Sequence, residues 1–284
     1  MKARHIDVTT SDFRNIRSDK AIYVDKTHLV YDLVHDGRAI FLSRPRRFGM
    51  SLLVSVLQAY FEGRKELFDG LAMAELEQEW VQFPVFKFDL SPIHYERPDQ
   101  LADVLDTGLT PYESIYGRAK SDNPGLRLHT LIRRACDKTG QQAVVLIDEY
   151  DAPLLDVMRE EAFEPLRDML QGFYKVLKES TAYLRFVFLT GITKFSQLSI
   201  FSALSNLTDI SLDPKYAAIC GITHEELVTV LRPEIEAMAA KRGQCVEKIL
   251  SDPLLSHNFS EQRKLRIHNR FSHFGYEIIV ENFV

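Results

Sequence analysis

The chain has 284 residues, of which 45% are hydrophobic and 26% are charged, a composition typical of a globular protein with a substantial core. The formal net charge of −5 argues against a protein that coats nucleic acid by bulk positive charge. Three widely spaced cysteines without a CxxC pair, an N-terminus without a signal-peptide pattern and the absence of a long apolar run predict a cytoplasmic protein without membrane contact.

Short apolar runs, each bounded by turn residues or charge, predict four β-strands. They are AIFLS (39–43), PVFKFDLS (84–91), AVVLID (143–148) and YLRFVFLTG (183–191). Three of the runs are nearly continuous in apolar character, as in strands buried on both faces of a parallel sheet. The run at 84–91 alternates more, so we expect this strand nearer an edge.

Helical patterns separate these strands. They cover residues 27–34, 51–61, 101–109, 127–138 and 163–180. Strands that alternate with helices indicate βαβ units, and therefore an α/β fold in which helices sandwich a parallel sheet.

The pattern changes in the last quarter of the chain. Thr223, followed by Glu226, predicts a capping box that opens a helix, and a second helix is expected to start at Pro233 and end at Gly243. Beyond about residue 250 the sequence predicts no definite structure.

The segment RPRRFGMS (44–51) has the layout of a phosphate-binding loop between a buried strand and an amphipathic helix. Aligned with the Walker A pattern G-x-x-x-x-G-K-[ST], it keeps Gly49 and Ser51 but carries Arg44 for the first glycine and Met50 for the lysine. A basic strand-to-helix connection with Ser51 at the helix start would give the same letters. The candidate nucleotide-binding residues are Arg46, Arg47, Phe48, Gly49, Met50, Ser51 and Leu52.

The apolar run at 143–148 ends in two acids, as in a Walker B motif. In that arrangement Asp148 holds hydrated magnesium and Glu149 polarises the attacking water. The alternative is that these acids and Asp151 cap a following helix that has Pro153 in its first turn.

The fourth predicted strand ends in FLTGITKF (188–195), which offers polar groups to a terminal phosphate. Thr190 or Thr193 is a candidate phosphate sensor, and Lys194 is a candidate source of positive charge. The alternative is a strand-end turn with solvated polar groups.

Together these segments resemble the bacterial and archaeal family of predicted AAA-ATPase-like proteins, P-loop NTPases often fused to a PD-(D/E)XK nuclease-like domain. The resemblance extends from about residue 13 to about residue 243, and rests on the segments FRNIRSDKAIYVDKTHLVYDLV, IFLSRPRRFGMSLLVSVLQAYFEGRKELFDGL, FPVFKFDLS, VVLIDEYDAPL and FLTGITKFSQLSIFSALSNLTDIS. The motif YVDKT (23–27) is also typical of that family, and the residues themselves predict Asp25 as a helix N-cap.

The resemblance implies a P-loop NTPase fold that binds ATP and Mg²⁺. Gly49 and Ser51 would line the phosphate loop, Ser51 and Asp148 would hold magnesium, and Glu149 would activate water. The family loop usually reads RPRRFGKS, so Arg44 is normal for the group and Met50 is the departure.

Methionine fills the space of lysine but neither donates hydrogen bonds nor neutralises phosphate charge. We therefore expect an ATP-binding protein whose hydrolysis is weakened or absent, so that enzyme activity is itself in question. A second interpretation is a non-enzymatic scaffold that binds protein or nucleic acid on the same fold. A third, ranked lowest, is an active ATPase with a substituted cation.

The sequence predicts a division into an ATPase-like domain of residues 1–220 and a helical extension with a tail, 221–284. Residues 244–284 contain no acid followed by an E-x-K strand, so nuclease chemistry is not expected there. No arginine finger is assigned, and the oligomeric state is left open.

Overall fold

The computed structural model describes residues 10–158, 160–193 and 207–250. The chain forms two compact units: Asp25–Ile219, and a second unit that joins Met1–Val24 to Cys220–Val284. Within the described ranges, every helix is too short or too polar to traverse a bilayer.

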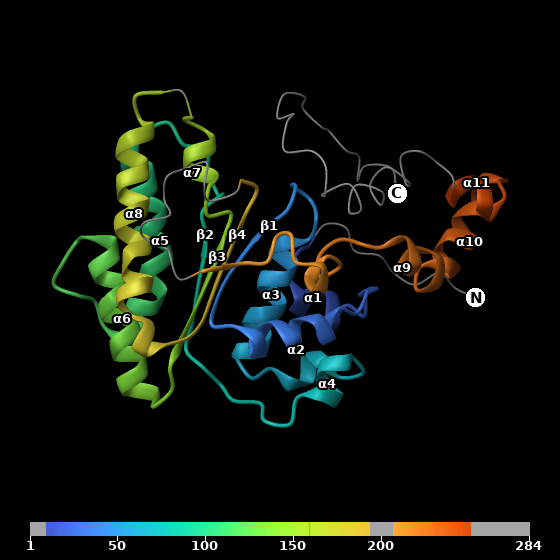
Figure 1. The fold of residues 1–284 in the computed structure, drawn as a ribbon, viewed down its shortest axis with the longest axis horizontal. Helices are drawn as coiled ribbons and strands as arrows, with labels where there is room; N and C mark the ends of the chain where they lie inside the picture. The colour runs from blue at the N-terminus through green and yellow to red at the C-terminus, as the bar shows by residue number, and fades with distance from the viewer. Residues whose placement is uncertain (1–9, 159, 194–206, 251–284) are drawn as a thin grey trace. The chain divides into compact units, whose positions relative to one another are not determined.

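The unit Asp25–Ile219 is built on a parallel five-stranded sheet of order β2-β3-β4-β1-β5 (Figure 1). Its strands are β1 (Ala39–Ser43), β2 (Val85–Asp89), β3 (Ala143–Asp148), β4 (Leu184–Gly191) and β5 (Thr208–Asp209). The α/β fold and the four long strands are as predicted, and β2 is an edge strand as its alternation indicated. β5 was missed because two exposed residues carry no periodic pattern.

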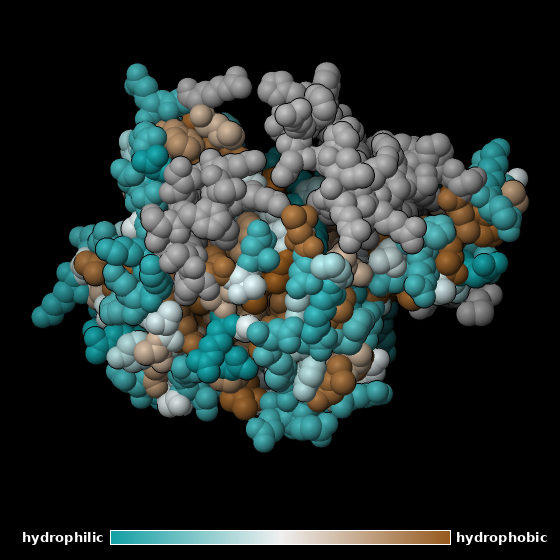
Figure 2. Space-filling view, viewed as in Figure 1, coloured by the Kyte–Doolittle hydropathy of each residue, from teal (hydrophilic) through white to brown (hydrophobic). Residues whose placement is uncertain are grey.

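Helices cover both faces of the sheet, with α5, α6 and α8 on one side and α2 and α3 on the other (Figure 1). The helices of this unit are α2 (Thr27–Asp36), α3 (Met50–Phe61), α4 (Ala72–Leu76), α5 (Pro98–Tyr116), α6 (Pro124–Thr139), α7 (Ala152–Leu155) and α8 (Phe163–Glu179), with short 3₁₀ turns η1 (Lys65–Phe68), η2 (Thr181–Tyr183) and η5 (Pro214–Tyr216). Hydrophilic residues predominate over the outer side of α6 and α8 in Figure 2.

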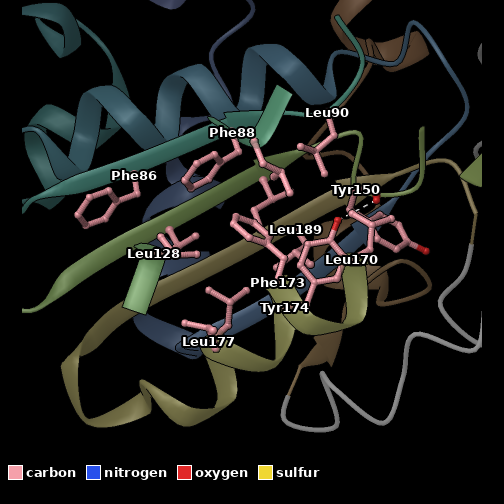
Figure 3. Close-up of a cluster of buried hydrophobic side chains, with 14 of the residues drawn as sticks. Phe86, Phe88, Leu90, Leu128, Tyr150, Leu170, Phe173, Tyr174, Leu177 and Leu189 are labelled. Carbon is pink, nitrogen blue, oxygen red and sulfur yellow. Dashed lines mark hydrogen bonds between the residues drawn. The ribbon is translucent and has the colours of Figure 1, made fainter. Parts of the chain in front are cut away.

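The main core lies between the sheet and the layer of α5, α6 and α8. Phe86 and Phe88 of β2 and Leu189 of β4 point toward Leu128 of α6 and Phe173 of α8 (Figure 3), and all five side chains are buried. Burying such apolar side chains contributes roughly 1.5–3 kcal/mol each. This packing fixes the strands whose carboxyl ends carry the predicted site.

The YVDKT motif ties α2 to α4. The Asp25 carboxylate accepts hydrogen bonds from the Thr27 backbone N–H (2.8 Å) and hydroxyl (2.7 Å), and from the Ala72 N–H at the start of α4 (2.8 Å). The Thr27 hydroxyl in turn accepts from the Met73 N–H at 2.9 Å. Asp25 thus accepts the first N–H of α2, but the N-cap residue is Lys26, so the prediction of Asp25 as the N-cap is wrong; the motif also supplies acceptors for the first turn of α4.

The second unit contributes only short helices to the described residues: α1 (Phe13–Ser18), α9 (His224–Thr229), α10 (Arg232–Arg242) and α11 (Val246–Leu250). The capping box of Thr223 and Glu226 is present at α9, and α10 ends at Gly243 in the left-handed conformation, both as predicted. The predicted division into 1–220 and 221–284 stays a prediction.

Candidate nucleotide-binding site

The loop between β1 and α3 turns sharply by means of two positive-φ residues. Arg47 has φ 66° and Gly49 has φ 82°, and α3 begins directly afterwards at Met50. The N-cap residue of α3 is Gly49, which has no side chain to cap the first turn. The partial positive charge of this helix terminus therefore faces the exposed loop, which is the arrangement that attracts phosphate.

Arg44 replaces the first glycine of the phosphate-loop pattern and is a buried anchor. Its backbone N–H donates to the Gly191 carbonyl at 3.2 Å, which ties the loop to the end of β4. Its guanidinium donates to the carbonyls of Ser211 (2.7 Å) and Tyr216 (3.2 Å). Arg44 thus holds the base of the loop in place, while Arg46 and Arg47 are exposed.

The side chains of Met50 and Thr190 are joined by a hydrogen bond. Met50 is 4% exposed and Thr190 fully buried, and the Thr190 hydroxyl donates to the Met50 sulfur at 2.8 Å. The residue at the lysine position therefore contacts the first predicted phosphate sensor at the end of the neighbouring strand β4.

The loop helix and the acidic end of β3 meet, because the side chain of Ser51 lies close enough to the carboxylate of Asp148 to lower its pKa. Asp148 is 3% exposed, and its Oδ1 has no hydrogen-bond partner among the described residues. Burial raises the pKa of Asp148, the nearby Ser51 side chain lowers it, and the charge of Asp89 raises it.

A magnesium ion fits this pair. The Ser51 hydroxyl and the Asp148 carboxylate, whose buried Oδ1 has no partner among the described residues, are hard oxygen donors of the kind that Mg²⁺ takes together with waters and substrate phosphates. No group of three or more His, Cys, Asp or Glu side chains in the described part of the chain could hold a metal ion. The remaining ligands of the magnesium ion would come from the phosphates of a nucleotide and from water.

Glu149 is held in a left-handed backbone conformation, with φ 52°, immediately after β3. Burial raises its pKa to about 7, assisted by the charges of Asp148 and Asp151, while the charge of Arg46 lowers it. A carboxylate with this pKa accepts a proton readily at neutral pH, which suits a general base.

We expect Glu149→Gln to stabilise the protein at pH 8 and to have little effect near pH 4. The folded-state pKa of Glu149 lies above its ordinary value of 4.5, so the folded protein binds more protons than the unfolded chain between about pH 4.5 and 7. The free energy of unfolding of the wild-type protein therefore falls as the pH rises through this window. Glu149→Gln has no carboxylate at this position and does not show this fall. Allowing for partial exposure, the difference at pH 8 is about 1–2 kcal/mol.

Urea denaturation of both proteins at the two pH values measures this difference. Glu161→Gln, at an exposed position, is the matched control and should follow the wild type at both pH values. Equal stability of Glu149→Gln and wild type at pH 8 would contradict the raised pKa.

The third acid of this segment, Asp151, organises the turn after β4. Its carboxylate accepts the Ile192 N–H at 3.1 Å, the Thr193 N–H at 2.6 Å and the Thr193 hydroxyl. Asp151 is the N-cap residue of α7 but makes no side-chain cap there, so the alternative reading of Asp151 as a helix cap is wrong; Pro153 does lie in the first turn of α7, as that reading expected.

Tyr150 completes this turn. Its N–H donates to the Thr190 carbonyl (2.9 Å) and its hydroxyl to the Thr193 carbonyl (3.0 Å), while the Tyr174 hydroxyl of α8 donates to the Tyr150 carbonyl at 2.8 Å (Figure 3). The Asp151 and Tyr150 contacts together fix the β3 and β4 ends against each other.

Sequence reasoning missed Asp89. It ends β2, pairs in register with Asp148, and its charge raises the pKa values of Asp148 and Glu149. The only signal was an acid at the carboxyl end of a predicted parallel strand. Of the predicted sensors, Thr190 lies at the end of β4 and Thr193 in the turn that follows it, whereas Lys194 lies outside the described residues. The roles predicted for the site residues stay predictions.

A parallel sheet covered on both faces, with a glycine loop leading into a helix beside an acidic strand end, defines an α/β fold of the P-loop ATPase type. The chain belongs to the family described as predicted AAA-ATPase, whose pattern it matches over residues 7–201.

Two similar proteins extend this comparison. The chain is 37% identical over 241 residues to an uncharacterized protein in the vnfD 5′ region of Azotobacter chroococcum mcd 1, an alignment that covers 84% of this chain and 47% of that protein. The chain thus spans about half the length of this relative. The chain also matches the structure of the Aeropyrum pernix ORC1 protein in complex with DNA, at 16% identity and a TM-score of 0.34, covering 85% of this chain and 62% of that one. A TM-score this low supports no comparison of sites or ligands.

Proposed function

We propose that this protein binds ATP with Mg²⁺ at the carboxyl edge of its sheet and hydrolyses it slowly or not at all. The observation that carries the proposal is the proximity of Ser51, in the first turn of α3, to the buried Asp148, whose Oδ1 has no partner among the described residues, at the end of β3. It joins the phosphate-attracting helix terminus to an oxygen donor pair suited to magnesium.

In this proposal the loop residues 46–52 surround the phosphates through the helix terminus and the glycine turn. Ser51 and Asp148 would hold Mg²⁺, which neutralises phosphate charge when bound. Glu149 would orient a water molecule and accept its proton, and its pKa of about 7 supports that role. Arg46 is exposed, and its charge acts on Glu149.

Weak hydrolysis follows from Met50. The lysine of a phosphate loop makes charge-assisted hydrogen bonds to the terminal phosphates, and loss of one such bond costs about 1.5–3 kcal/mol. Met50 is buried against Thr190 and has no positive charge to offer in its place. The loss is larger in the transition state, because charge is then redistributed onto the groups that the lysine faces.

Isothermal titration calorimetry with ATP, with and without Mg²⁺, tests the proposal. We expect saturable binding at or below about 1 mM nucleotide, which corresponds to about −4 kcal/mol, and tighter binding with Mg²⁺. Asp148→Asn should remove the gain that Mg²⁺ provides, while Asp103→Asn, at an exposed position on α5, should keep it. No binding at millimolar ATP would overturn the proposal and favour a non-enzymatic scaffold.

A further inference from the structure

The end of the site that would meet a terminal phosphate has its polar groups engaged internally. The Thr190 hydroxyl is fully buried and donates its proton to the Met50 sulfur. A hydroxyl has one proton to donate, so in this arrangement Thr190 offers none to a phosphate oxygen. Methionine at position 50 therefore lacks the positive charge of a lysine, and its sulfur also takes up the hydroxyl proton of Thr190.

The second threonine of this strand end is engaged in the same way. The hydroxyl and the backbone N–H of Thr193 both donate to the Asp151 carboxylate, which is fully buried. Both hydroxyls predicted to sense a terminal phosphate thus have partners within the protein.

Among the described residues, carboxylates gather at this end, with the charge of Lys87 acting on Asp148 and that of Arg46 on Glu149. Asp148 and Glu149 follow one another along the chain, and Asp89 pairs in register with Asp148 on the adjacent strand. A third phosphate group would add negative charge beside these carboxylates, where the lysine would normally oppose it. The α3 terminus, in contrast, keeps its attraction for the phosphates nearer the nucleoside.

We infer that this site prefers a nucleoside diphosphate to the corresponding triphosphate, because Met50 removes the cation and masks the Thr190 hydroxyl that a terminal phosphate needs. The inference rests on the proposed function and gives its ligand class: the site retains ADP, or the product of another enzyme's nucleoside triphosphate hydrolysis, in preference to ATP.

Calorimetric titration of the full chain with ADP and with ATP, both in excess EDTA, tests the preference directly. The third phosphate of ATP brings negative charge next to the carboxylates of the site and thereby lowers affinity. We therefore expect ADP to bind about tenfold more tightly than ATP. Equal affinities, or tighter ATP binding, would overturn the inference while leaving the proposed function in place. If neither nucleotide binds in EDTA or in a repeat titration with Mg²⁺, the proposed function fails and the inference fails with it.

Met50→Lys should reverse the preference. Restoring a charge-assisted hydrogen bond should raise ATP affinity about 10–100-fold, with a smaller gain for ADP. A thermal unfolding curve confirms that the variant is folded. If the ratio of the two affinities is unchanged in folded Met50→Lys, position 50 does not set the preference and the inference is overturned.

Met50→Leu is the matched variant that separates masking from charge. It keeps a buried apolar side chain of similar volume but removes the sulfur acceptor, so the Thr190 hydroxyl becomes available. We expect ATP affinity to rise by up to about tenfold, and the gain to disappear when Thr190→Val is added. If Met50→Leu binds ATP no more tightly than the wild type, the masking of Thr190 is overturned.

Discussion

Met50→Lys is expected to hydrolyse ATP about 10²–10³ times faster than the wild-type protein, a gain similar to the loss measured on removing one transition-state donor from an enzyme. The rest of the site is already arranged for the reaction. Ser51 and Asp148 are in contact, and Glu149 has a pKa raised to about 7 by burial beside two other acids. Lysine would add positive charge where negative charge is redistributed during phosphoryl transfer.

Phosphate release under saturating ATP and Mg²⁺ measures this gain as a turnover number, which separates it from the change in affinity. Met50→Leu should show no such rise, because it adds no charge. Met50→Lys combined with Glu149→Gln should return to the wild-type rate, because the base that accepts the water proton is gone. A wild-type rate already equal to that of Met50→Lys would show that another cation replaces the lysine.

The parts of this fold that were predictable are those whose burial leaves a periodic pattern. β1 and β3 coincide with the predicted runs at 39–43 and 143–148, because strands covered on both faces are continuously apolar. The helix limits were less accurate. α5 was expected over 101–109 and covers Pro98–Tyr116, since its first turn is closed by the Gln100 side chain, which accepts the Arg97 N–H, and no apolar spacing indicates this contact.

The site was predictable in its residue types and less so in its contacts. The proximity of Ser51 to Asp148 follows from the rule that ligands of parallel sheets lie at the carboxyl ends of the strands. The Met50–Thr190 contact joins residues far apart in the sequence, and no local pattern encodes it. The same holds for Arg44, whose guanidinium donates to the carbonyl groups of Ser211 and Tyr216.

Gly191→Ala is expected to destabilise the protein by about 3 kcal/mol, the upper part of the usual range for overpacking a core. A methyl group at Gly191 would collide with Asp151 Oδ1, and it would lie 2.5 Å from the nearest atom of the Tyr150 ring. Neither neighbour can move freely. Asp151 holds the Ile192 and Thr193 N–H groups, and the Tyr150 hydroxyl donates to the Thr193 carbonyl. The glycine is therefore required by close packing.

Gly172→Ala provides the matched control, because the same methyl group has nothing within 4 Å there. Gly172 is exposed inside α8, where alanine is the better helix former, so we expect a gain of about 0.5–1 kcal/mol in urea denaturation. Equal effects at both positions would contradict the role given to the Gly191 packing.

Nucleotide affinity should separate the two glycine variants further. The Gly191 carbonyl accepts the Arg44 N–H at the base of the phosphate loop, so a shift of this backbone moves the loop as well as the turn that carries Thr190 and Thr193. Gly191→Ala should therefore lose nucleotide affinity under conditions in which it is still folded, and Gly172→Ala should not. A stability loss with unchanged affinity would mean that the loop holds its shape without the β4 end, which Arg44 would then secure through its contacts with Ser211 and Tyr216 alone.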